Sequence, residues 1–109
     1  MKELALPTIG SALVGAGLIA LGIGDGPSAT RTVEMRDFVF RPARIEVDVG
    51  DTVVWLNRDA LPHTATARGA WDSGGMASGA RWSWVASRRD TVEYICTYHP
   101  TMRGTIVVR

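Results

Sequence analysis

The sequence predicts an all-β domain, a Greek-key β-sandwich of seven or eight strands that residues 30–109 build. Apolar and polar residues alternate at period two through most of this region, as expected for strands with one buried face. Clusters of glycine, proline and aspartate interrupt the pattern at short intervals, and no amphipathic helix of useful length is indicated. Two packed sheets are the usual solution for such a pattern.

Three candidate strands open the domain, at residues 32–35, 38–40 and 44–49. Pro42 separates the second from the third, because proline cannot donate to a sheet ladder. The third alternates most clearly between apolar and acidic residues. Its apolar face consists of Ile45, Val47 and Val49.

The Gly50-Asp51 pair comes next and suits a tight hairpin with glycine in first position. We therefore expect residues 44–49 to pair with residues 52–57, TVVWLN. The second of these strands is more continuously apolar, which predicts a central position in its sheet. A short strand at residues 63–67 follows a loop.

The rest of the domain begins with residues 68–80, which are rich in Gly, Ser and Ala and predict a long loop. Candidate strands follow at residues 81–85, 91–96 and 105–108. Period two places these side chains on one face of their strands: Trp82 and Trp84 in the first, and Val92, Tyr94 and Cys96 in the second.

The start of the chain has a different character. Residues 4–23 carry no charge, follow Lys2 and precede small residues, which is the layout of a secretory signal. The segment is also long enough to span a bilayer, and Pro7 and the glycines at 10, 15, 17 and 22 disfavour a buried soluble helix. We assign residues 1–29 to a cleaved signal peptide or a membrane anchor with a short linker, and residues 30–109 to the domain. Both alternatives predict a periplasmic or other extracytoplasmic location.

The charge pattern argues against nucleic-acid binding. The chain has 12 Lys and Arg against 11 Asp and Glu, and its arginines are scattered rather than grouped with aromatic residues. We expect a monomeric domain.

Cys96 is the only cysteine of the chain. Exported proteins usually use cysteines in disulfide-bonded pairs, so an unpaired thiol outside the cytoplasm must be buried or put to use. An immunoglobulin-type sandwich would show the same strand pattern, but Cys96 lacks the second cysteine that those domains commonly pair.

The stretch CTYHPTM, residues 96–102, places Cys96, His99 and Met102 at a spacing of three. That spacing would share a helix face, but Pro100 pushes His99 out of the helical region. A tight loop between two strands fits better, and in such a loop the three side chains can turn toward one point.

Copper chemistry explains this choice of residue types. A trigonal site of two histidines and one cysteine with a weak axial methionine is the ligand set of electron-transfer copper. The loop supplies one histidine, and His63 is the only other one in the chain. His63 follows the strand at 52–57, and loops at one end of a sandwich lie close together, so His63 is the candidate fourth ligand.

Two segments, FVFRPARIEVDVGDTVVWLNRDALPH and YICTYHPTMRGTIVV, resemble the cupredoxins, the small blue copper proteins that include plastocyanin. The short C-x2-H-x2-M loop is most similar to that of amicyanin. The resemblance implies one copper ion that alternates between Cu(I) and Cu(II). It also implies His63, Cys96 and His99 as equatorial ligands and Met102 as the axial ligand.

Two residues beside the candidate ligands depart from the family pattern. Thr64 stands where many cupredoxins have an asparagine that ties the two copper-binding loops together. Tyr98 stands where amicyanin-like loops usually have proline, and it keeps a backbone N–H that could donate to the Cys96 sulfur.

The resemblance implies an electron carrier rather than an enzyme, with His99 as the ligand whose edge reaches the surface. Its partners would be redox proteins such as a c-type cytochrome or a dehydrogenase. A small apolar patch would receive them, made of Leu61, Pro62, Met76, Tyr98 and Pro100. The alternative is a protein that stores, delivers or senses copper with the same ligands. A nitrite-reductase type of enzyme needs further histidines, and the chain has none.

Overall fold

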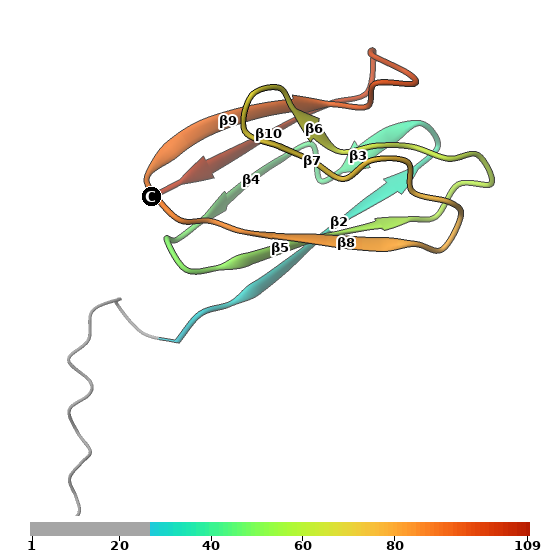
Figure 1. Cartoon of the computed structure of the whole chain (residues 1–109). Coiled ribbons are helices and arrows are strands. Elements are labelled where there is room, and N and C mark those ends of the chain that lie inside the picture. The colour runs from blue at the N-terminus through green and yellow to red at the C-terminus, as the bar shows by residue number, and fades with distance from the viewer. Residues whose placement is uncertain (1–26) are drawn as a thin grey trace, which may run out of the picture.

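The computed structural model describes residues 27–109 and shows two mixed β-sheets packed face to face (Figure 1). The first sheet has the order β3-β2-β5-β8, with the bounds Val39–Arg41, Thr30–Arg36, Thr52–Asn57 and Arg81–Val85. The second has the order β4-β10-β9-β6-β7, with the bounds Arg44–Val47, Arg103–Val108, Asp90–Ile95, Thr66–Ala67 and Trp71–Asp72. The predicted all-β sandwich is confirmed.

The pairing within the sheets is mixed. Strand β2 runs parallel to β5, and β4 runs parallel to β10, while the remaining neighbours are antiparallel. The predicted central position of residues 52–57 is confirmed, because β5 lies between β2 and β8. This part of the chain has nine strands, since β7 forms inside the segment 68–80 that was predicted to be a loop.

No helix that could cross a membrane occurs within residues 27–109. The predicted signal or anchor segment, residues 4–23, lies outside the residues that the structure describes.

The predicted hairpin at Gly50-Asp51 was wrong. Strands β4 and β5 belong to different sheets, so this turn carries the chain from one sheet to the other. Gly50 has a φ of 98° and donates its N–H to the carbonyl of Ala86 at 2.7 Å. Val49 was expected on the buried face but is 46% exposed, because β4 ends at Val47.

The predicted strand at residues 63–67 is only partly regular. Its last two residues form β6, and His63 makes an isolated bridge with Met76 through two backbone hydrogen bonds of 3.1 and 2.8 Å. This bridge fixes the start of the segment against the loop that precedes β8.

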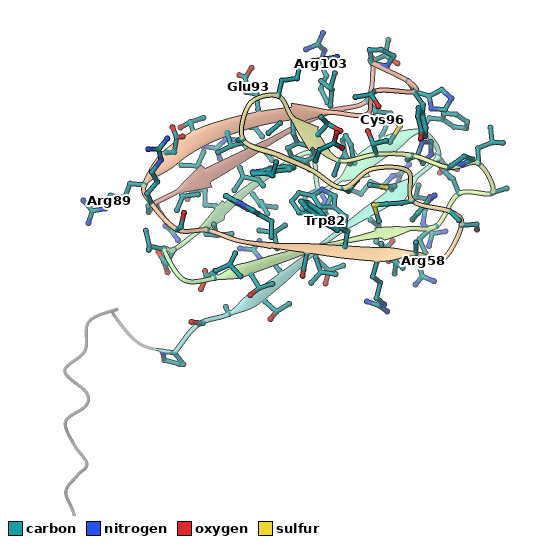
Figure 2. All side chains as sticks on the ribbon, in the orientation of Figure 1. Arg58, Trp82, Arg89, Glu93, Cys96 and Arg103 are labelled. Carbon is teal, nitrogen blue, oxygen red and sulfur yellow. The ribbon has the colours of Figure 1, made fainter. Side chains whose placement is uncertain are left out.

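Aromatic rings fill much of the space between the sheets. Trp55 is fully buried, and its ring centroid lies 5.4 Å from that of Tyr94, 5.1 Å from that of Trp71 and 5.5 Å from that of Trp82. Figure 2 shows Trp82 on the inner side of β8, with Cys96 toward one end of the sandwich and Arg89 at the other. The buried aliphatic residues come from both sheets, as the alternation predicted: Val33, Met35, Ile45, Val47, Val53, Ile106 and Val108.

Gly104 in β10 lies opposite Tyr94 in the neighbouring strand, and a Cβ at this position would overlap the buried Tyr94 ring. Gly75 has a similar neighbour, because a Cβ there would lie 2.7 Å from the hydroxyl of Tyr98. Tyr98 is 53% exposed, so its ring can move aside, whereas Tyr94 is enclosed by the core.

We therefore expect Gly104→Ala to lower the free energy of unfolding by about 1–3 kcal/mol, the usual cost of overfilling a packed interior. The matched change Gly75→Ala should alter it by less than about 0.5 kcal/mol, as a surface substitution does. Urea unfolding followed by tryptophan fluorescence measures both. Equal losses would contradict this account of the two tyrosines.

Candidate metal centre

His63, Cys96 and His99 come together at one end of the sandwich. Their ligand atoms all lie within 4.8 Å of one another. The Cys96 Sγ is 3.8 Å from Nδ1 of His63 and 3.9 Å from Nδ1 of His99. Cys96 directly follows β9, His99 lies in the loop between β9 and β10, and His63 precedes β6. Both imidazoles thus present the same nitrogen to the thiol.

The donor set and its burial fit copper. Cys96 is a free thiol with no exposed surface, and the His63 side chain is also fully buried. Soft thiolate sulfur and imidazole nitrogen together favour copper over oxygen-preferring cations. His99 is only partly buried, so one edge of the cluster reaches the surface.

The loop that carries Cys96 and His99 is tight, as Pro100 predicted. Met102 donates its N–H to the carbonyl of His99 at 2.9 Å, and Cys96 donates its N–H to the carbonyl of Met102 at 3.1 Å. The Met102 side chain is almost fully buried, at 1% exposed. The loop therefore returns Met102 to the interior at the end where the two histidines lie.

Thr64 ties the two candidate copper loops together. Its hydroxyl oxygen accepts the backbone N–H of Thr97 at 2.8 Å, and its own N–H donates to Cys96 Sγ at 3.4 Å. The tie expected of an asparagine is thus made by a threonine. The sequence offered the Tyr98 N–H as a donor to the sulfur, and within residues 27–109 the backbone N–H that donates to it is that of Thr64.

Asp59 determines how His63 presents its ring. The carboxylate oxygen Oδ2 lies 2.8 Å from Nε2 of His63. An ionised carboxylate can only accept, so Nε2 carries the proton and Nδ1 keeps its lone pair. That lone pair faces the Cys96 sulfur, which is the orientation a metal requires.

The same carboxylate holds the turn between β2 and β3. Asp59 accepts the backbone N–H of Asp37 at 2.7 Å and that of Phe38 at 2.9 Å. Burial raises the pKa of Asp59, but the hydrogen bonds from Phe38, His63 and Asp37 outweigh it, so this pKa lies below its ordinary value. Asp37 and Phe38 have φ angles of 57° and 60°, a left-handed conformation that is uncommon for a bulky residue.

Sequence reasoning missed two residues near the cluster, Asp59 and Phe38. The Phe38 ring makes edge-to-face contacts with His63, at a centroid distance of 5.2 Å, and with His99, at 4.8 Å. Phe38 was expected inside a strand, whereas β3 begins one residue later. The position of Asp59, four residues before His63, is a sequence signal that could have indicated its hydrogen bond to His63. No local pattern indicates the contacts of the Phe38 ring.

The residues predicted for an apolar patch divide into two groups. Leu61 is 51% exposed and Tyr98 is 53% exposed, and Pro62 and Pro100 are exposed as well. Met76 is only 3% exposed, because its backbone pairs with His63 and its side chain joins the core. Assigning Met76 to an exposed patch was therefore wrong.

The model of the family described as copper binding proteins, plastocyanin/azurin family, matches residues 28–109. The chain therefore belongs to this family. The fold, the two-histidine, one-cysteine cluster and the family together define a blue copper electron carrier with one copper ion.

Within that class the chain is similar to amicyanins. It is 32% identical over 95 residues to amicyanin from Paracoccus denitrificans, which covers 82% of this chain and 70% of that protein. Amicyanin-alpha from Methylorubrum extorquens is 27% identical over 118 aligned positions, 99% of each chain. The solved Cu(I) form of an amicyanin mutant superposes with a TM-score of 0.69 at 30% identity, covering 78% of this chain and 87% of that one.

We expect Asp59→Asn to weaken copper binding by about 10–100-fold, the usual effect of losing a hydrogen-bond partner of a metal-binding histidine. The amide can donate to His63 and so permits the tautomer with the proton on Nδ1. Competition with a chelator of known affinity measures the change.

The matched control is Asp37→Asn, on the same turn. Its side chain contacts Arg41 at the surface rather than a candidate ligand. Equal losses of affinity in the two variants would contradict the proposed role of Asp59.

Proposed function

We propose that the protein carries single electrons between redox proteins outside the cytoplasm, through a type 1 copper site. His63, Cys96 and His99 would hold the ion, and Met102 would be the weak axial ligand. The observation that carries the proposal is the convergence of two Nδ1 atoms on a buried, unpaired thiol. When bound, copper supplies a one-electron couple between Cu(I) and Cu(II).

The surroundings of the cluster suit this task, because hydrogen bonds and packing from the protein hold the candidate ligands. Asp59 orients His63, and Thr64 joins the two loops that carry the candidate ligands. A site that is held in this way needs little rearrangement when its charge changes. His99 remains partly exposed and offers an edge through which an electron can leave.

The exposed apolar residues around His99 support docking of a redox partner. Leu61, Pro62, Tyr98 and Pro100 are exposed, and Phe38 joins them at 42% exposed. Short-lived redox complexes use small surfaces of this kind. A c-type cytochrome or a dehydrogenase is the class of partner that we propose.

An extracytoplasmic location is supported by the uncharged segment at residues 4–23, which has the composition of a signal or an anchor. A free cysteine fits that location here because Cys96 is buried, and a bound metal would protect it further from oxidation.

The decisive measurement is the visible absorption spectrum of the protein after one equivalent of Cu(II) is added. We expect an intense blue band that disappears on reduction and is absent in Cys96→Ser, because the band arises from the bond between sulfur and copper. A weak, pale band in the unaltered protein would contradict a type 1 site.

Electron exchange with a c-type cytochrome then separates a carrier from a protein that stores, delivers or senses copper. Rapid and reversible exchange is expected of the carrier. A blue protein that exchanges slowly with every redox partner tried would favour the storage alternative.

We expect Leu61→Lys to slow this exchange by about tenfold, since a buried charge at a docking surface costs about 1.4 kcal/mol or more. The reduction potential should change little, because Leu61 is outside the ligand cluster. Stopped-flow kinetics measures the rate.

Val85→Lys is the matched control. Val85 is 56% exposed and ends β8 opposite Thr52, at the far end of β5 from the candidate site. Equal slowing in Leu61→Lys and Val85→Lys would contradict the proposal that the partner docks on the exposed apolar residues around His99.

A further inference from the structure

A chain of hydroxyl groups leads from the candidate copper loop to a surface carboxylate. Thr97 contacts the Thr64 hydroxyl oxygen twice, through its N–H at 2.8 Å and through its own hydroxyl at 3.2 Å. The Thr64 hydroxyl lies 2.9 Å from that of Thr66, and the Thr66 hydroxyl donates to Oδ1 of Asp72 at 2.9 Å. Thr64 and Thr66 are buried, and Asp72 is exposed.

The direction of every hydrogen bond in this chain follows from counting protons. Each hydroxyl has one proton to donate. Thr66 gives its proton to Asp72, so Thr64 must be the donor to Thr66. Thr64 then has no proton left for Thr97, so Thr97 must donate both its O–H and its N–H to Thr64. All the bonds point from the copper loop toward the carboxylate.

Asp72 can set this direction because its surroundings keep its carboxylate ionised, and an ionised carboxylate only accepts hydrogen bonds. The N–H of Gly74 donates to its Oδ1 at 2.8 Å. Hydrogen bonds from Gly74 and Thr66, with help from the charge of Arg68, keep the pKa of Asp72 below its ordinary value. A hydrogen bond to an ionised group is stronger than a neutral one, and bonds in a chain polarise one another.

We propose that Asp72 is a remote positioning residue for the copper loop, acting through Thr66 and Thr64 to hold the backbone N–H of Thr97. Thr97 directly follows Cys96, and Thr64 both follows His63 and donates its N–H to the Cys96 sulfur. Two candidate ligands thus depend on the placement of one hydroxyl. The effect on copper rests on the function proposed above, whereas the hydrogen-bond chain consists of protein groups alone.

The test compares Thr66→Val with Thr66→Ser in the metal-free protein. Valine keeps the shape and strand preference of threonine but removes the hydroxyl, and serine keeps the hydroxyl. NMR measures the hydrogen-exchange rate of the Thr97 amide. We expect it to rise about tenfold in Thr66→Val, a change equal to roughly 1.4 kcal/mol, and to stay near the original rate in Thr66→Ser.

Ser73→Ala is the matched control, because Ser73 anchors the same turn to the same segment without belonging to the chain. Its hydroxyl oxygen accepts the N–H of Ala65 at 2.8 Å. Equal acceleration of Thr97 exchange in Ser73→Ala and Thr66→Val would overturn the proposal, since the turn would then act only as a structural anchor.

Asp72→Ala removes the final acceptor of the chain at an exposed position. Its effect on the exchange of the Thr97 amide tests the proposal if Thr66→Val does not fold. Faster exchange of the Thr97 amide supports the proposal, and an unchanged rate overturns it. In the copper-loaded protein we expect Thr66→Val to lower the reduction potential. The hydrogen bond from the Thr64 N–H to the Cys96 sulfur stabilises the reduced state, in which the sulfur is more negative, so weakening this bond makes reduction less favourable.

An unchanged reduction potential in Thr66→Val would contradict the claim that the hydrogen-bond chain influences the bound copper. Failure of the protein to bind copper would contradict the proposed function alone, because the amide exchange is measured without metal.

Discussion

The contact on which the site depends is the junction between Thr64 and the Cys96–Thr97 peptide. Thr64 lies 32 residues before Cys96 and on a different loop, yet its N–H donates to the Cys96 sulfur and its hydroxyl accepts the N–H of Thr97. Apart from this junction, the segment that carries His63 and the loop that carries His99 meet through ring contacts between the two imidazoles and with Phe38. The junction holds Cys96 beside the segment that begins at His63, where the thiol and two imidazole nitrogens converge.

The sandwich makes this junction possible because both loops emerge at the same end of packed strands. The loop with His63 leaves β5, the central strand of one sheet, and the loop with Cys96 and His99 joins β9 to β10 in the other. The interlocked aromatic rings behind them, with Trp55 at the centre, leave the sheets little freedom to slide. A rigid support of this kind suits an ion whose charge changes while its ligands stay in place.

Strain at the edge of the site is offset by one carboxylate. Asp37 and Phe38 adopt positive φ angles, which costs about 1–3 kcal/mol for residues other than glycine. Asp59 accepts the N–H of both residues and orients His63 with the same group. The result is an aromatic ring that touches both imidazoles and still reaches the surface. The conformation of the turn and the orientation of His63 are therefore coupled.

Much of this protein can be read from the sequence alone. Period-two alternation and turn residues determine the all-β class, and the single cysteine and two histidines leave one choice of cluster. The spacing around Pro100 predicts the tight loop as well. The tertiary structure alone decided that Gly50 and Asp51 connect two sheets and that Met76 is buried. It also decided that Asp59 and Phe38 contact the candidate histidine ligands. The physical reason is that local pattern reports which face of a strand is apolar, whereas these contacts join residues that are far apart in the chain and meet only when the sheets pack.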